Sequence, residues 1–416
     1  MPKGTMTSFD PASLVPPSHS SDQFMELEAT HGAHNYHPLP IVLARARGAW
    51  VQDIGGKRYL DMLSSYSALN QGHRHPKIIG ALMAQADRLT LTSRAFYNDQ
   101  LGPFLAKLTE MSGFEVVLPM NTGAEAVETA IKAARKWAYK VKCVEAGKAE
   151  IITAAGNFHG RTTTVVGFST EEQYQDGFGP FTPGFVSVPF GDAGALENAI
   201  GPNTAAFLVE PIQAEGGIVM PPDGYFKRVR ELCTEHNVLL IMDEIQTGLG
   251  RTGRMFAYER EDIRPDCITL GKALGGGVYP VSAFLADREV MDLFTPGDHG
   301  STFGGNPLGA AVGLASLEVI VDEGLAERSH RLGEKLMNKI RDLKSPHVTE
   351  VRGAGLLVGV EIHSKSGPAR PFCEQLMERG LLCKETHEQV IRLAPPLNID
   401  EDDLDYAIGL LAEVLV

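Results

Sequence analysis

Short apolar segments alternate with amphipathic helical segments through the middle of the sequence. The apolar segments, which are bounded by turns, are residues 150–153, 204–210, 237–244 and 266–270. Between the second and third of them, Phe226, Val229 and Leu232 recur at helical spacing. Apolar strands separated by helices are typical of a mostly parallel sheet that helices cover on both faces. The middle of the chain is therefore predicted to be an α/β domain.

This pattern changes after residue 305. Two long helices are predicted at about 308–322 and 324–343, and strands follow at about 348–351 and 355–362. We expect an N-terminal segment over residues 1–60, a large domain over 61–305 and a smaller α+β domain over 306–416. A chain of 416 residues, 43% of them hydrophobic, is long enough to bury cores of this size.

Charge and cysteine content restrict the partners and the compartment. The formal net charge of −14 repels phosphate backbones and anionic membrane surfaces, so we expect neither nucleic acid nor membrane as a partner. Residues 1–22 are rich in Pro and Ser and show no targeting pattern, and no apolar run approaches the length of a membrane span. The five cysteines form no C-x-x-C pair, which is typical of reduced thiols. We expect a soluble, cytoplasmic protein.

Two motifs resemble ligand sites but are better explained as structure. Residues 248–253 (GLGRTG) match the G-x-G-x-x-G dinucleotide pattern, yet no clear amphipathic helix follows them, so we predict a glycine-rich structural turn. His31, His34 and His37 are spaced by three, but residues between them break helix, and no cysteine or carboxylate completes a ligand set. We expect no metal.

A phosphate-ready helix is predicted at residues 120–137. Thr122 and Glu125 form a T-x-x-E capping box, and Val127, Ile131 and Ala134 share one face of the helix that follows. Gly123 leaves the first amides of this helix unshielded, and a helix N-terminus of that kind binds anions. Alone this signal is weak, because most capped helices bind nothing.

An aspartate and a lysine at strand ends complete a chemical set. Asp243 ends the apolar run 238–243, where α/β proteins place ligands, although an aspartate that only caps the next turn is equally expected there. Lys272 lies between a strand end and the glycines 275–277. A lysine that forms a Schiff base, an aspartate that keeps a pyridinium nitrogen protonated and a helix that holds a phosphate together fit pyridoxal 5'-phosphate.

With these residues identified, the sequence resembles the class III (fold-type I) aminotransferases, and within that class it is most similar to ornithine δ-aminotransferases. The resemblance runs over roughly residues 24–413. The stretches that carry it are 32–40 (GAHNYHPLP), 64–73 (SSYSALNQGH), 120–126, 157–161, 210–217, 243–253, 271–277 and 299–307. The fold that it implies is a large domain with a mostly parallel seven-stranded sheet, plus a smaller α+β C-terminal domain.

The resemblance implies the following cofactor contacts. Lys272 would bind pyridoxal 5'-phosphate covalently and later shuttle a proton, and Asp243 would pair with the pyridinium nitrogen. The residues expected to complete the cofactor site are Phe158 and Ile245 on the two ring faces, Gln246 at the phenolic oxygen, Gly123 and Ala124 at the phosphate, Glu210 as support, and Ser301 and Thr302 reaching the phosphate from a second subunit. The active site would therefore need a homodimer, and higher oligomers stay open.

The resemblance also implies substrate contacts. Arg161 and Tyr36 would hold the distal carboxylate, and Tyr66 would line the pocket. Arg392 matches the arginine that grips an α-carboxylate, and Glu215 would pair with it while ornithine reacts. His159 and the loop residues Ala214 and Gly217 vary from the family pattern, and we expect none of the three to touch the chemistry.

The implied activity is transfer of the δ-amino group of L-ornithine to 2-oxoglutarate by a ping-pong mechanism. The products would be glutamate and glutamate-5-semialdehyde, which cyclises to pyrroline-5-carboxylate. The alternatives are an acetylornithine or 4-aminobutyrate aminotransferase of the same class, a nucleotide-dependent oxidoreductase that uses the 248–253 turn, and a non-catalytic cofactor-binding module. Whether the pathway runs towards proline, glutamate or arginine stays open.

Overall fold

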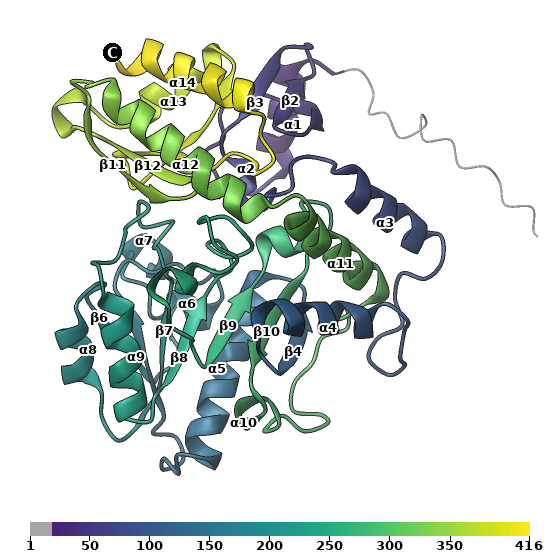
Figure 1. Ribbon diagram of the computed structural model, residues 1–416, viewed down its shortest axis with the longest axis vertical. Coiled ribbons are helices and arrows are strands. Elements are labelled where there is room, and N and C mark those ends of the chain that lie inside the picture. Colours follow the sequence, from purple (N-terminus) through teal and green to yellow (C-terminus); the bar gives the residue numbers. More distant parts are fainter. Residues whose placement is uncertain (1–18) are drawn as a thin grey trace, which may run out of the picture.

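A seven-stranded sheet forms the centre of the fold in the computed structural model, which describes residues 19–416 (Figure 1). The strand order is β4-β10-β9-β8-β7-β5-β6. Strands β5 to β9 run parallel, whereas β10 is antiparallel to both of its neighbours. The strands are β4 (Val116–Met120), β5 (Glu150–Ala154), β6 (Phe185–Val188), β7 (Thr204–Val209), β8 (Leu239–Asp243), β9 (Cys267–Leu270) and β10 (Ser282–Ala286). The predicted mostly parallel sheet is confirmed, and the four predicted strands lie within two residues of the observed bounds.

Helices cover both faces of this sheet, which explains the continuous apolar strands. Every residue of β7 is buried. Leu208 packs into the cluster that contains α5 (Gly123–Lys140), whereas Phe207 and Val209 pack into the cluster on the other face, which contains α9 (Tyr225–Glu235). Alternate residues of one strand thus contact different helices, so no position on it can be polar without a partner.

Further helices pack around the seven-stranded sheet. Helix α8 (Ala193–Ala199) packs beside α9, and α11 (Pro307–Asp322) packs against α3 (Pro76–Ala86) and α4 (Leu101–Ser112). Short helices connect the strands: α2 (Ser64–Ser67), α6 (Thr163–Val166), α7 (Glu172–Gln175), α10 (Arg288–Met291), η2 (Ala257–Glu261) and η3 (Lys272–Gly275). Residues 248–253 form turns. The next element is the short 3-10 helix η2 rather than an α-helix, so the predicted structural turn is confirmed.

The C-terminal part contains a second sheet, of four antiparallel strands in the order β11-β12-β15-β14. Its elements are α12 (Leu325–Asp342), β11 (Val348–Ala354), β12 (Leu357–Ile362), η4 (Ser364–Ser366), α13 (Arg370–Glu378), β13 (Leu381–Leu382), β14 (Lys384–Thr386), β15 (Val390–Leu393) and α14 (Glu401–Leu415). The predicted helices and strands of this part are confirmed. In Figure 1 these elements form the upper layer of the molecule.

The N-terminal strands lie with the C-terminal part. Strands β1 (Leu43–Arg47), β2 (Trp50–Asp53) and β3 (Arg58–Asp61) form a sheet whose fourth strand is β13, parallel to β3. Helix α1 (Ser21–His31) precedes them. Our division into residues 1–60, 61–305 and 306–416 stays a prediction. Residues 1–18, most of the stretch for which we expect no targeting pattern, lie outside the described residues.

Candidate active site

Asp243 and Lys272 lie at the carboxyl ends of adjacent parallel strands. Asp243 is the last residue of β8 and pairs in register with Thr269 of β9, and Lys272 follows β9 after a single glycine. The cavity at this edge is lined by Gly123, Ala124, Phe158, His159, Gly160, Glu210, Asp243, Ile245, Gln246, Thr247 and Lys272. The structure thus brings together both expected catalytic residues and all the expected cofactor-binding residues except Ser301 and Thr302.

The Asp243 carboxylate is held by three donors. Its Oδ1 accepts hydrogen bonds from Thr269 Oγ1 and from the Ile245 amide, both at 3.1 Å. Its Oδ2 accepts a bond of 2.7 Å from His159 Nδ1. These bonds fix the orientation of the carboxylate at the cavity wall.

His159 contacts the carboxylate of Asp243, although we expected it to lie apart from the proposed catalytic residues. Its side chain is fully buried against Asp243. Burial alone would lower the pKa of the imidazole, but the hydrogen bond and the negative charge of Asp243 raise that pKa above its ordinary value. The sequence held one signal that we did not use: His159 lies in the short segment that follows β5, and all carboxyl ends of parallel strands meet at the same edge.

Lys272 presents its amine to the cavity beside Gln246. Nζ donates to Gln246 Oε1 at 3.1 Å, and the residue has a left-handed φ of 44°. Burial lowers the pKa of the amine, although Glu215 and Asp243 oppose this shift. A lowered pKa favours the uncharged amine, which is the form that acts as a nucleophile or base.

The N-terminus of α5 forms another part of the cavity wall. The predicted capping box is confirmed: the Glu125 amide donates to Thr122 Oγ1 at 3.3 Å, and the Thr122 amide donates to Glu125 Oε2 at 2.7 Å. A Cβ at Gly123 would come within 3.0 Å of Ile245 Cδ1, so only glycine fits there without displacement of that side chain. The amides of Gly123 and Ala124 therefore remain accessible to an anion.

Glu210 lines the cavity and contacts the backbone of Phe158. Its Oε2 accepts a bond of 2.9 Å from the Phe158 amide. Burial raises the pKa of the Glu210 carboxyl to about 8, with the charge of His159 opposing the shift. At neutral pH this carboxyl is mostly protonated, which avoids a second negative charge beside Asp243.

Arg392 and Glu215 form an ion pair in the same region. Arg392, on β15, donates from Nη1 to Glu215 Oε1 at 2.6 Å, and Gln246 Nε2 donates to the same oxygen at 3.3 Å. Burial alone would raise the pKa of Glu215, but Arg392 and then Lys272 lower it below its ordinary value. Gln246 therefore connects Lys272 to the carboxylate that covers Arg392.

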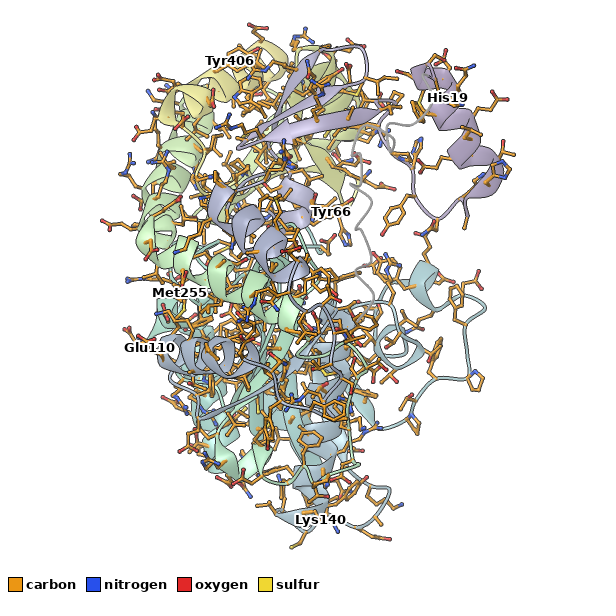
Figure 2. The ribbon with its side chains drawn as sticks, turned by 90° about the vertical axis from the view of Figure 1, so that its right-hand side faces the viewer. His19, Tyr66, Glu110, Lys140, Met255 and Tyr406 are labelled. Atoms are coloured by element: carbon orange, nitrogen blue, oxygen red, sulfur yellow. The ribbon has the colours of Figure 1, made fainter. Side chains whose placement is uncertain are left out.

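Tyr66 covers the other side of Arg392. The guanidinium carbon of Arg392 lies 4.8 Å from the centre of the Tyr66 ring. Tyr66 belongs to a left-handed turn in which the φ angles of Ser64, Ser65, Tyr66 and Ser67 are 51°, 47°, 59° and 70°. In Figure 2 Tyr66 lies between the upper layer, which carries Tyr406, and the lower layer, which ends near Lys140.

Arg161 and Tyr36 approach the site less directly. The Arg161 guanidinium lies 3.6 Å from the ring centre of Tyr174 and 5.3 Å from that of Phe158, which lines the cavity. Tyr36 is 76% exposed and lines a neighbouring hollow together with Tyr66. The sequence did not lead us to expect Tyr174 as the contact of Arg161.

Ser301 and Thr302 do not line the cavity of their own chain. Ser301 Oγ accepts a bond of 2.8 Å from Asn121 Nδ2, directly before the α5 cap, and Thr302 is exposed. Their expected role towards a second subunit stays a prediction. Among residues 19–416, no group of three or more His, Cys, Asp or Glu side chains is arranged to hold a metal ion.

Comparisons with known proteins identify the relatives of this chain. Residues 31–415 match the class-III aminotransferase family. An ornithine aminotransferase from Brevibacillus brevis is 60% identical over 384 residues, which are 92% of this chain and 96% of that protein. A Toxoplasma gondii ornithine aminotransferase structure, described as holding PLP at partial occupancy in its active site, has a TM-score of 0.94 and 46% identity over 95% of this chain and 94% of its own. An acetylornithine aminotransferase structure from Elizabethkingia anophelis has a TM-score of 0.87 and 48% identity over 96% and 99%.

Proposed function

Because this chain belongs to the class-III aminotransferases, we propose that it transfers the δ-amino group of L-ornithine to 2-oxoglutarate. The products are glutamate and glutamate-5-semialdehyde, which cyclises to pyrroline-5-carboxylate, an intermediate that links ornithine to proline and arginine metabolism. The identity of 60% to an ornithine aminotransferase over 92% of the chain supports this substrate. Both half-reactions use the same site in turn, as in other ping-pong enzymes.

The observation that carries this proposal is the ion pair between Arg392 and Glu215 at 2.6 Å, beside Lys272. A free arginine would bind the α-carboxylate of any amino acid and direct its α-amine towards Lys272. With Glu215 on Arg392, the α-carboxylate of ornithine binds elsewhere, to Arg161 and Tyr36, and the δ-amine faces Lys272. 2-Oxoglutarate carries a carboxylate at each end and can displace Glu215 from Arg392.

The residues present fit pyridoxal 5'-phosphate, on which class-III aminotransferases depend. The glycine cradle at Gly123, the amine of Lys272 and the oriented carboxylate of Asp243 surround one cavity. When bound, the cofactor supplies an aldehyde that condenses with amines and a pyridine ring that accepts electrons. The protein supplies the binding groups, the orientation and the proton transfers.

Each of these residues has a separate task. The Gly123 and Ala124 amides would bind the phosphate, Phe158 and Ile245 would enclose the ring, and Gln246 would bind the phenolic oxygen. Asp243 would hold a proton on the ring nitrogen, and His159 and Thr269 keep its carboxylate in place. Lys272 Nζ would hold the cofactor and would move a proton at the reacting carbon, a task that its lowered pKa favours.

The proposal includes a cytoplasmic homodimer. Ser301 contacts Asn121 beside the α5 cap, and neither Ser301 nor Thr302 lines the cavity of its own chain, which supports a role at a shared site. The five cysteines are free thiols, as in a reducing compartment. Within residues 19–416, no helix is long and apolar enough to cross a membrane.

A panel of single half-reactions tests the substrate. The holoenzyme is mixed with ornithine, N-acetylornithine, 4-aminobutyrate or glutamate, and the visible absorbance band of the cofactor is followed by stopped flow. We expect ornithine to react fastest and its product, alone among those of the ω-amines, to be trapped as the cyclic imine by an aromatic amine. A faster reaction with N-acetylornithine or 4-aminobutyrate would contradict the proposal. Lys272→Ala serves as the inactive control.

A further inference from the structure

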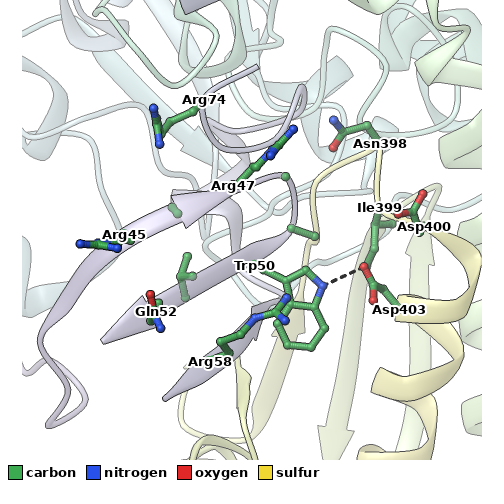
Figure 3. A pocket seen from close by; sticks show the side chains of 14 residues that line it. Arg45, Arg47, Trp50, Gln52, Arg58, Arg74, Asn398, Ile399, Asp400 and Asp403 are labelled. Carbon is green, nitrogen blue, oxygen red and sulfur yellow. Dashed lines mark hydrogen bonds between the residues drawn. The ribbon is translucent and has the colours of Figure 1, made fainter. Parts of the chain in front are cut away.

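A second cavity, of about 510 Å³, lies on the N-terminal sheet and shares no lining residue with the active-site cavity. Four arginines line it: Arg45 and Arg47 on β1, Arg58 on β3, and Arg74 before α3. In Figure 3 Arg58 lies beside Trp50 and Arg47 points towards Asn398, whereas Arg45 and Arg74 lie away from Trp50. Arg45 and Arg47 are two residues apart on one strand, so they point to the same face of the sheet.

Three of these arginines lack a protein partner. The side chains of Arg45, Arg47 and Arg74 are exposed and form no hydrogen bond or ion pair within the described part of the chain. By contrast, Arg228 lies within 4 Å of three glutamates, as expected in a chain with a net charge of −14. Three unpaired arginines around one cavity therefore form a local concentration of positive charge in an acidic chain.

The remaining polar groups of this cavity leave it positively charged. Trp50 Nε1 donates to Asp403 Oδ2 at 2.9 Å, so this carboxylate already has a partner. Asp400 is the other acidic residue of the lining. The guanidinium of Arg58 lies 4.5 Å from the Trp50 ring centre and covers the indole.

The geometry of guanidinium groups indicates the ligand. Each guanidinium presents a planar fork of donors that matches a phosphate or carboxylate through two parallel bonds. Three unpaired forks need more acceptor oxygens than one carboxylate supplies, whereas a chain of two or three phosphates supplies enough. The cavity volume lies within the range of roughly 300–1,000 Å³ that is usual for small-molecule sites.

We propose that this cavity binds a linear polyphosphate group through Arg45, Arg47 and Arg74. Inorganic triphosphate and the phosphate chain of a nucleoside triphosphate offer the same chemistry. Arg58 covers the Trp50 indole, and Tyr406 lies 6.1 Å from the centre of the same ring, so among the described residues Trp50 offers little aromatic surface to a base. Inorganic triphosphate and ATP therefore bind with similar affinity.

Titration calorimetry of the holoenzyme tests this site. Inorganic triphosphate and ATP are titrated separately, without divalent metal, at low and at moderate salt. We expect one site per chain for both ligands, with weaker binding at higher salt, since the contacts are exposed charges. Absence of saturable binding of inorganic triphosphate would overturn the proposal, and so would ATP binding more than about tenfold tighter, because a base would then be recognised.

Variants locate the bound anion. Arg45→Ala/Arg47→Ala removes two charge-assisted contacts and is expected to weaken binding about 100-fold or more. Arg228→Ala/Arg288→Ala removes the same charge from other exposed sites and is expected to bind as the wild type does. Arg74→Ala provides an independent single substitution, expected to weaken binding about tenfold or more. Both the double variant and Arg74→Ala are expected to keep wild-type turnover.

Two results would assign the anion or the cavity differently. Unchanged triphosphate binding by Arg45→Ala/Arg47→Ala would place the anion elsewhere, for instance at Arg161, and would overturn the proposal. A change of oligomeric state in that variant, measured by light scattering and accompanied by no triphosphate binding in the wild type, would identify the cavity as a contact between copies of this chain.

Discussion

At the scale of single residues, the site is organised by charges that neutralise one another. Glu215 lies between Arg392 and Gln246, and Gln246 contacts Lys272. Asp243 has His159 as its partner, and Glu210 is mostly protonated at neutral pH. Each of these carboxyl groups is therefore paired with a basic residue or neutralised by a proton.

Replacement of Glu215 by alanine tests the covered arginine. We expect Glu215→Ala to accelerate the half-reaction with glutamate and to let ornithine react at its α-amine, because Arg392 becomes free to bind α-carboxylates. A charge pair at about 4 Å contributes roughly 4 kcal/mol at an effective dielectric of about 20, and each ~1.4 kcal/mol changes a rate ratio tenfold. Stopped-flow half-reactions and product analysis measure the preference. An unchanged preference for ornithine, with δ-product alone, would show that Glu215 does not control which carboxylates Arg392 binds.

A second buried carboxyl makes stability depend on pH. Burial raises the pKa of Glu244 from 4.5 to about 8, although Thr247 and the Tyr258 amide donate to it. The folded state therefore holds a proton that the unfolded chain loses above its own pKa. The stability that is present below pH 4.5 declines as the pH rises towards about 8.

Glu244→Gln replaces the ionisable carboxyl group by an amide of nearly the same shape. We expect the variant to melt at nearly the wild-type temperature near pH 5 and above it at pH 8–9, because an amide does not ionise. Melting curves across this pH range measure the difference. Glu110→Gln, an exposed carboxylate paired only with Lys107, is the control and should follow the wild type. A constant difference at all pH values would contradict a titrating Glu244.

At the scale of elements, the turn 64–67 is the most strained part of the site. Left-handed residues other than glycine cost roughly 1–2 kcal/mol each, and four follow one another here. Asp61 stabilises the turn, because its Oδ1 accepts bonds of 2.9 Å from the Leu63 and Ser64 amides, and His73 lies 2.8 Å from its Oδ2. The strain is retained where Tyr66 must face Arg392, which is typical of functional sites.

Ser65, which is exposed, allows this strain to be measured. Ser65→Gly should raise the melting temperature by about 1–2 °C, because the relief of strain exceeds the entropic cost of glycine, about 0.5–1 kcal/mol. Ser65→Val should lower the melting temperature, since a β-branched residue fits a positive φ poorly. Thermal melts of the three proteins, with Tyr66 unchanged, provide the test. A destabilised glycine variant would show that the turn is not strained at Ser65.

The elements themselves could be predicted where local pattern decides them. The strands around Phe207 and Ile241, the capped helix after Thr122 and the glycine-rich turn before η2 all follow from apolar periodicity or turn chemistry in a few consecutive residues. The left-handed turn at residues 64–67 could not be predicted, because its sequence, SSYS, contains no glycine. It is held from outside by Asp61, whose Oδ1 accepts a bond from the Ser64 amide and whose Oδ2 contacts His73.

The candidate site was predictable for a different reason. Asp243 and Lys272 end strands that the sequence already identifies, so the parallel sheet brings them together. The contact of His159 with Asp243 and that of Arg161 with Tyr174 join segments whose meeting depends on loop paths. Periodicity says nothing about loop paths, so only the structure reveals these contacts.

At the scale of the whole molecule, one buried arginine connects the layer around the seven-stranded sheet to the C-terminal layer. Arg251, in the turn 248–253, is fully buried and donates to Asn70 Oδ1 at 2.6 Å, to the Leu356 carbonyl at 2.9 Å and to the Pro395 carbonyl at 2.6 Å. Leu356 and Pro395 belong to the C-terminal sheet region that also carries Arg392. No carboxylate pairs with Arg251 within residues 19–416, and burial lowers its pKa to about 9.

Loss of this arginine should loosen the connection between the layers. Arg251→Met leaves one side-chain oxygen and two carbonyls without donors in a buried region, so we expect a loss of about 3–5 kcal/mol in the free energy of unfolding. Arg251→Lys should lose nearly as much, because a single ammonium cannot reproduce the planar fork that reaches three acceptors. Arg254→Met, at an exposed position directly after that turn, is the control and should change stability by less than about 0.5 kcal/mol. Urea unfolding of the holoenzyme measures all three variants. If Arg251→Met matched Arg254→Met, the three bonds would contribute nothing net, and the contact between the layers would depend on apolar packing alone.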